Sequence, residues 1–215
     1  MIDSMKKNII IITGLLVTVA VLFVHATETL EEQTGYAIGD MAADFSLPNV
    51  DGNKVSLADY GTAKGFIVVF TCNTCPYAKL YESRIMDLDK KYASKGFPVI
   101  AINPNDISQK PEDSMEEMVK RSKDKGYTFP YLRDDSQKTA MAYGATKTPH
   151  VYVLNKEGKS DYRVAYIGAI DDSPREIADV REKYVEDAIE ALLSGNSPSV
   201  TEKRAIGCTI KWKES

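Results

Sequence analysis

The sequence is poor in cysteine, histidine and tryptophan, and it has no excess of basic residues. Its 215 residues include 3 cysteines, 2 histidines and 1 tryptophan, and 27 Lys and Arg stand against 31 Asp and Glu. Three cysteines are too few for a disulfide-stapled scaffold. The net charge of −4 argues against a nucleic-acid-binding protein, which normally carries a basic excess. With 43% hydrophobic residues, the chain is too apolar to be wholly disordered.

The first 26 residues have the pattern of a targeting segment. Lys6 and Lys7 precede an uncharged apolar run over 9–24, and Ala26 follows near a suitable cleavage site. The run is shorter than the roughly 20 residues that a membrane-spanning helix needs. We expect a cleaved secretory signal over 1–26, with an uncleaved membrane anchor or a buried core helix as the alternatives. Export predicts a periplasmic or secreted protein, with a membrane tether if the segment stays attached, and it permits disulfide bonds.

The rest of the chain alternates strand and helix patterns. We predict a flexible lead-in over 27–38, one α/β domain over 39–195, and a C-terminal tail over 196–215. This order of elements predicts a small mixed β-sheet with helices on both faces and an N-terminal β-hairpin extension. The expected elements are a hairpin of 45–50 with 54–57 around Asp51-Gly52, strands at 66–70, 98–102, 151–154 and 163–167, and helices at 76–94, 114–125, 136–143 and 174–193.

Two of the three cysteines stand where a buried strand gives way to a helix. Cys72 and Cys75 follow the apolar run at 66–70, and Pro76 suits the first turn of the next helix. Partial positive charge at a helix N-terminus stabilises a thiolate, and the two-residue spacing brings the second thiol within bonding reach. The pair is able to alternate between dithiol and disulfide. We therefore predict a redox-active Cys-x-x-Cys.

A structural zinc site and an inert structural disulfide are two other interpretations of this pair. Structural zinc needs about four ligands, and beyond the pair the chain after residue 26 offers only Cys208 and His150 as cysteine or histidine ligands. An inert structural disulfide is disfavoured because so short a spacing is strained and reducible. We expect no metal and no cofactor at this site.

A second segment strengthens the interpretation. Thr148-Pro149-His150 immediately precedes the strand at 151–154, and the tail carries Ile-Gly-Cys-Thr-Ile-Lys-Trp over 206–212. With these motifs, the chain from about residue 39 to 212 resembles the thioredoxin-like redoxins. This group contains TlpA/ResA-type thiol-disulfide oxidoreductases and alkyl hydroperoxide reductase/thiol-specific antioxidant proteins. The likeness is greatest to a secreted bacterial subset.

The resemblance implies a thioredoxin-like fold and a role for each motif residue. Cys72 would be the exposed attacking thiol and Cys75 the resolving thiol. Pro149 would be a cis-proline that shapes the substrate groove, with Thr148 and His150 beside the substrate. It also implies protein disulfides as substrates, a redox protein as electron donor, and a thiol-disulfide oxidoreductase that works in the reductive direction.

Some positions depart from the pattern of these relatives. Phe66 and Ala78 stand where some of them carry an acid, which leaves Glu82 as a weak candidate for a proton acceptor to Cys75. The peroxidatic pattern P-x-x-x-T-x-x-C fails for both cysteines, because Val69 stands three residues before Cys72 and Cys72 itself stands three before Cys75. A peroxidase-like antioxidant redoxin is therefore only an alternative.

The sequence allows three roles each for Cys208 and His150. Cys208 is an odd thiol in an exported chain, and it fits a third redox cysteine, a buried inert residue or an intermolecular crosslink. His150 fits a packed strand residue, a group that tunes the thiolate, or a soft-metal ligand. With Cys72 and Cys75 it could hold Cu(I), so a copper-binding or metallochaperone module is a further alternative.

Overall fold

The computed structural model describes residues 35–159 and 161–214. The predicted export segment over 1–26 and most of the predicted lead-in lie outside the described residues. In the part of the chain that is described, no helix is both long enough and apolar enough to span a bilayer.

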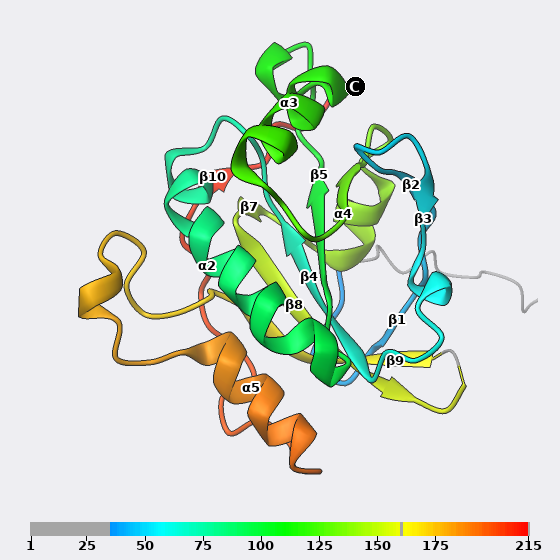
Figure 1. The fold of residues 1–215 in the computed structure, drawn as a ribbon, viewed down its shortest axis with the longest axis vertical. Helices are drawn as coiled ribbons and strands as arrows, with labels where there is room; N and C mark the ends of the chain where they lie inside the picture. The colour runs from blue at the N-terminus through cyan, green and yellow to red at the C-terminus, as the bar shows by residue number, and fades with distance from the viewer. Residues whose placement is uncertain (1–34, 160, 215) are drawn as a thin grey trace, which may run out of the picture. The chain divides into compact units, whose positions relative to one another are not determined.

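A six-stranded mixed sheet forms the centre, in the order β1-β9-β8-β4-β5-β6 (Figure 1). β4, β5 and β6 are parallel, whereas β8 runs antiparallel to β4, β9 to β8 and β1 to β9. The strands are β1 (Met41–Ala42), β4 (Gly65–Phe70), β5 (Val99–Asn103), β6 (Tyr131–Arg133), β8 (His150–Glu157) and β9 (Asp161–Gly168).

β4 lies in the middle of the sheet because its side chains suit burial on both faces. All six of its residues are buried, and the run is apolar and rich in β-branched side chains. Ile67 and Val69 belong to the core on one face of the sheet, and Phe66, Val68 and Phe70 belong to the core on the other. The strand therefore holds the turn that follows it against a rigid support.

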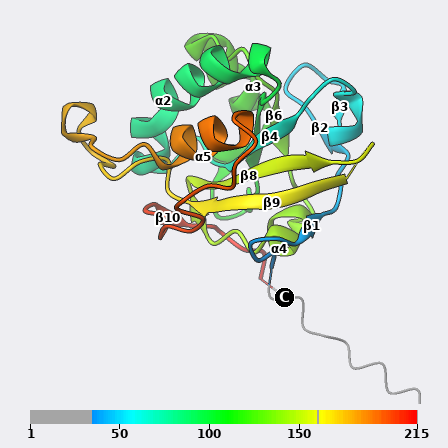
Figure 2. The same cartoon turned by 90° about the horizontal axis from the view of Figure 1, so that it is seen from below.

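Helices cover both faces of the sheet, as predicted (Figure 2). Residues of three of the helices join the core that contains Ile67, and residues of a shorter helix join the core that contains Phe66. The three helices are α2 (Pro76–Tyr92), α3 (Met115–Lys125) and α5 (Tyr184–Leu193), and the shorter one is α4 (Lys138–Tyr143). Four 3-10 turns accompany them, at Leu57–Asp59, Ala93–Lys95, Pro111–Asp113 and Ile177–Asp179.

The predicted N-terminal hairpin is also present. β2 (Leu47–Pro48) pairs antiparallel with β3 (Lys54–Val55), and Gly52 takes a positive φ of 89° in the connection. That backbone region is open to glycine at little cost, which explains the Asp-Gly signal. The mixed sheet, its helical cover and its hairpin extension are therefore confirmed.

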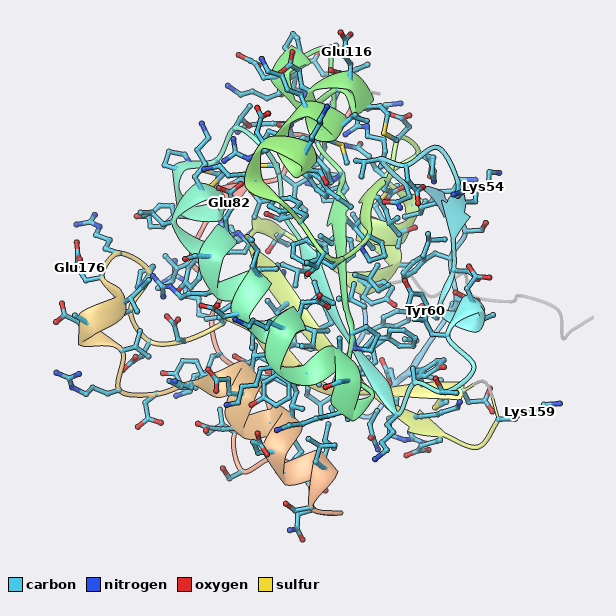
Figure 3. The ribbon with its side chains drawn as sticks, in the orientation of Figure 1. Lys54, Tyr60, Glu82, Glu116, Lys159 and Glu176 are labelled. Atoms are coloured by element: carbon cyan, nitrogen blue, oxygen red, sulfur yellow. The ribbon has the colours of Figure 1, made fainter. Side chains whose placement is uncertain are left out.

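The long helix predicted over 174–193 is wrong in its first half. Only α5 is regular helix, and the preceding residues form a loop with one 3-10 turn, on which Glu176 is labelled in Figure 3. Tertiary contacts hold the backbone of this loop. The carboxylate of Asp172 accepts the N–H of Arg181 at 2.9 Å, and Arg84 donates to the carbonyl of Ser173 at 2.7 Å. These bonds replace the local ones that a helix would make.

Three smaller differences concern strands and one helix face. β6 was not predicted, because three residues carry little periodicity. The β8–β9 hairpin is longer than expected, and strand pairing continues through Glu157. Leu80, which was placed on the apolar face of α2, is 44% exposed, whereas Ile85 and Leu88 are buried as expected.

The C-terminal tail adds a second pair of short strands. β10 (Cys208–Thr209) pairs antiparallel with β7 (Lys147–Thr148), so that Cys208 lies opposite Thr148. Figure 1 shows β10 beside β7, near the beginning of α2. Sequence periodicity gave no sign of this strand, because it is two residues long and its partner lies about sixty positions away.

Candidate functional site

Cys72 and Cys75 occupy the turn between β4 and α2, as the sequence predicted. Cys75 is the residue before the helix, with an extended backbone, and Pro76 takes the first helical position. Both sulfurs belong to residues that are buried, with Cys72 5% and Cys75 2% exposed. The expectation of an exposed attacking thiol is therefore wrong for the reduced state that the structure represents, in which all three cysteines are free.

Hydrogen-bond donors surround the Cys72 sulfur. The backbone N–H of Cys75 lies 3.4 Å from it, the Thr148 hydroxyl 3.3 Å and the Thr74 hydroxyl 3.8 Å. A thiolate is stabilised by such donors, because each directs partial positive charge at the sulfur. The helix N-terminus acts in the same direction. This pocket suits a nucleophilic sulfur.

The Cys75 sulfur lies between Thr148 and Cys208. It donates to the backbone carbonyl of Thr148 at 3.0 Å, and the N–H of Cys208 lies 3.3 Å from it. The peptide bond between Thr148 and Pro149 is cis, which agrees with the role that the resemblance implied for Pro149. Residues from three distant parts of the chain thus meet at two sulfurs.

The two thiols of the pair titrate together. Hydrogen bonding with Cys72 lowers the pKa of Cys75 to about 4, and hydrogen bonding with Cys75 together with burial raises the pKa of Cys72. The Thr148 carbonyl, which accepts from Cys75, and the donors around Cys72 act in the opposite sense. We conclude that both sulfurs share the charge of the singly ionised pair, and that the first proton leaves more easily than from an ordinary thiol.

A buried carboxylate that no sequence motif indicated supports the turn between the two cysteines by accepting hydrogen bonds from it. Asp113 is fully buried and accepts the backbone N–H of Asn73 at 2.6 Å and the Thr74 hydroxyl at 2.8 Å. The side-chain amides of Asn103 and Asn105 donate to the same carboxylate at 3.2 and 2.8 Å. Asp113 therefore positions the two residues between the cysteines. The sequence offered one indication of this role, since Asp113 follows β5, a buried strand that runs parallel to β4.

Glu82 is not a proton acceptor for Cys75. Figure 3 labels it on α2 beside α3, and its carboxylate accepts from Arg121 and Tyr127 and lies 3.7 Å from the Lys125 ammonium. This ion-pair cluster joins the two helices and commits the Glu82 oxygens elsewhere. Among the described residues, no hydrogen bond connects Glu82 to either sulfur.

His150 is buried beside the cis-proline, and none of the hydrogen bonds described for this part of the chain joins it to a cysteine. Its Nδ1 accepts the N–H of Thr146 at 3.3 Å, and its ring packs 5.0 Å from the ring of Tyr152. Burial lowers the pKa of His150 to about 4, so the ring is neutral near pH 7. The described residues contain no group of three cysteine, histidine or acidic side chains arranged to hold a metal ion.

Comparison with known proteins agrees with this geometry. The AhpC/TSA family model matches residues 38–163. The chain belongs to the AhpC/TSA family. It is 26% identical over 159 residues to the thiol-disulfide oxidoreductase ResA of Geobacillus kaustophilus, over 72% of this chain and 85% of that protein. The predicted family is thereby confirmed, as is the enzyme class, oxidoreductase.

Solved structures support the fold. An uncharacterized conserved protein from Geobacillus kaustophilus is 40% identical, with a TM-score of 0.77 over 84% of this chain and 94% of that one. A putative thiol:disulfide interchange protein DsbE from Chlorobium tepidum is 23% identical, with a TM-score of 0.54 over 74% of this chain and 99% of that one. At that identity the likeness concerns the fold alone, and it confirms the predicted thioredoxin-like fold.

The shared ionisation of the cysteine pair is testable by titration. We expect thiolate absorbance at 240 nm in the reduced protein to rise well below pH 9, since each sulfur stabilises the charge of the other. Cys75→Ser removes the coupling, and burial then keeps the pKa of Cys72 at or above its ordinary value. Thr209→Ala, an exposed change on the tail, is the control. A low first pKa that survives in Cys75→Ser would refute the coupling.

Asp113→Asn tests the support of the turn. The amide cannot accept the four hydrogen bonds that the carboxylate accepts, and its NH2 group would face donors. We expect a loss of about 3 kcal/mol in the free energy of unfolding, measured by urea denaturation. Asp87→Asn, an exposed substitution on α2, should change the same free energy by less than about 0.5 kcal/mol. Equal effects of the two substitutions would contradict the role assigned to Asp113.

His150 predicts a pH dependence of stability. The unfolded chain, with an ordinary histidine pKa of 6.5, binds a proton that the folded chain refuses until about pH 4. Stability is therefore full above pH 6.5 and falls as the pH drops toward 4, by at most about 3 kcal/mol. His150→Gln should remove that part of the decline in urea midpoints measured between pH 4 and 7. Parallel curves for the two proteins would show that burial of His150 has no such effect.

Proposed function

We propose that this protein exchanges thiols and disulfides with protein substrates through Cys72 and Cys75. The observation that carries the proposal is the cysteine pair at the start of α2, in which the Cys72 sulfur is surrounded by hydrogen-bond donors. A dithiol built in this way supplies a nucleophile at neutral pH and a second thiol within reach of the product. The names of the relatives point in the same direction.

The proposed reaction has two exchange steps. The Cys72 thiolate attacks one sulfur of a substrate disulfide, a Cys72–substrate mixed disulfide forms, and the other substrate sulfur leaves as a thiolate. The Cys75 thiolate then attacks Cys72, which forms the Cys72–Cys75 disulfide and releases the second substrate thiolate. The substrate gains two electrons and the pair loses two. The N–H of Cys75 and the hydroxyl of Thr148 face Cys72 throughout.

The segment at Thr148 and Pro149 is the proposed substrate-contact surface. Its backbone already forms an antiparallel pair with another extended segment, β10, and it lies directly against the redox sulfurs. A substrate peptide would lie against this segment where it borders the two sulfurs, beside the edge that β10 already occupies. His150 stays a predicted neighbour of the bound substrate.

The cellular setting follows from the same proposal. Electrons would come from a donor redox protein, since a reduced pair has to be regenerated after each cycle. We place the reaction in an exported, bacterial setting, periplasmic or secreted, which rests on the sequence pattern of residues 1–26. The reductive direction rests on the TlpA/ResA likeness.

Cys75→Ser should trap the substrate on Cys72. With oxidised insulin in excess, we expect a Cys72–insulin mixed disulfide that is stable in non-reducing electrophoresis and identified by mass spectrometry. Insulin reduction in the presence of dithiothreitol should fall on the order of 10³-fold, because the resolving step is lost. Asp87→Asn, an exposed change on α2, should retain full activity.

Two outcomes would oppose the proposal. Absence of the adduct in Cys75→Ser, with no insulin reduction by the unmodified protein, would leave the fold without this activity. Consumption of hydrogen peroxide at a higher rate than of insulin disulfides would favour the peroxidase alternative, although the peroxidatic sequence pattern is missing around both cysteines.

A further inference from the structure

The C-terminal segment 205–212, here called the strap, holds Cys208 against the redox pair. Its backbone pairs with β7, and Ile210 donates to the carbonyl of Thr146 at 3.2 Å. Gly207 packs so closely that a β-carbon there would lie 2.2 Å from the carbonyl oxygen of Thr148. A residue with a side chain would push the strap off this edge. Glycine at 207 thus permits Cys208 to approach the sulfurs.

The far end of the strap is anchored as well. The N–H of Lys211 donates to the side-chain oxygen of Asn105 at 2.9 Å, and the carbonyl of Lys211 accepts the N–H of Asp106 and the amide of Gln137, both at 2.8 Å. Asn105 also donates to Asp113, which supports the turn between the cysteines. One buried polar network therefore positions both the strap and the cysteine pair.

Cys75 is the middle sulfur of the three. It packs with Cys72, and the backbone N–H of Cys208 lies 3.3 Å from its sulfur. Interaction with the Cys208 thiol helps to lower the pKa of Cys75. Cys208 is the most exposed of the three residues, being half-buried where the other two are buried.

We propose that Cys208 is the exit thiol of a three-cysteine relay. After the pair has reduced a substrate, the Cys208 thiolate attacks Cys75 within the Cys72–Cys75 disulfide. The Cys75–Cys208 disulfide forms, the Cys72–Cys75 bond breaks, and Cys72 leaves as the thiolate that accepts the proton lost from Cys208. No electrons are gained or lost, and the disulfide moves from a buried position to the most accessible of the three sulfurs. This relay rests on the proposed function of the pair.

The electrostatics of the strap agree with this order of events. Burial raises the pKa of Cys208 to about 11, and negative charge on Cys75 adds to the effect, while Lys211 and Lys147 lower it. Once Cys75 is part of a disulfide, its negative charge is gone and the two lysines remain. Cys208 therefore becomes easier to ionise when the relay needs it. A dithiol protein acting as electron donor would then attack the half-buried Cys208 rather than the buried pair.

Disulfide mapping of variants in which one of the three cysteines is replaced by serine tests the relay. Reduced Cys72→Ser, treated with one equivalent of diamide and quenched with N-ethylmaleimide, should form an intramolecular Cys75–Cys208 disulfide in most molecules. Cys75→Ser should form no intramolecular disulfide, since Cys72 and Cys208 each hydrogen-bond with Cys75 and none of the described hydrogen bonds joins the two directly. The unmodified chain should contain both the Cys72–Cys75 and the Cys75–Cys208 isomers, and Asp87→Asn, an exposed change on α2, should match it.

The relay is overturned if Cys75 and Cys208 of the Cys72→Ser protein stay reduced after diamide and are then alkylated by N-ethylmaleimide. It is also overturned if they form only intermolecular disulfides. Failure of the proposed function would look different. In that case the unmodified chain would form no Cys72–Cys75 disulfide in a single turnover with insulin, whatever happens at Cys208. Serine is close in size to cysteine, so we expect each variant to keep its fold. Circular dichroism of each variant is the measurement that checks this.

Discussion

The site depends on the contact between Thr148 and the two redox sulfurs. In the pairing of β4 with β8, Phe70 lies opposite His150, and the same register continued by two residues brings Cys72 to Thr148. The Thr148 hydroxyl then hydrogen-bonds with the Cys72 sulfur, and the Thr148 carbonyl accepts a hydrogen bond from the Cys75 thiol. A buried carbonyl without a partner costs about 1–3 kcal/mol, so strand pairing and the position of the sulfurs stabilise one another.

A second constraint lies beneath this contact. Asp113 is a fully buried carboxylate without a cationic partner among its described hydrogen bonds, and four donors from the turn and from neighbouring polar residues satisfy it. Such a network is stable only when every member is placed correctly. Through Asn105 it also reaches the backbone of the strap. The turn, the parallel strand β5 and the chain end therefore form one unit around the cysteines.

The burial of the pair shapes its chemistry. Cys72 and Cys75 are nearly inaccessible in the reduced state, and desolvation by itself would raise the pKa of both thiols. The sulfurs counter this effect by hydrogen bonding to one another, so that one charge is spread over two atoms. Stabilisation comes from the neighbours of the pair rather than from solvent, and the reactive sulfur is protected from oxidants that are not seated in the site.

Local sequence determined the central part of this structure and the location of the chemistry. The apolar run at β4, the Cys-x-x-Cys before α2, the Asp-Gly hairpin and the Pro149 segment are short-range patterns, and each appears where it was predicted. A strand, a helix start or a turn is selected by residues within a few positions of one another. These patterns, together with the family likeness, were sufficient to predict the fold and the place of the cysteine pair within it.

Tertiary structure alone decided the position of Cys208, the support by Asp113, the burial of Cys72 and the loop before α5. Each depends on partners far away in the chain: Cys208 on Thr148, Asp113 on the turn after β4, and the backbone carbonyl of Ser173 on Arg84. Such contacts have no period and no spacing rule, because they exist only after the sheet has brought distant segments together. The sequence therefore placed the two sulfurs, and only the folded chain showed that a third one lies beside them.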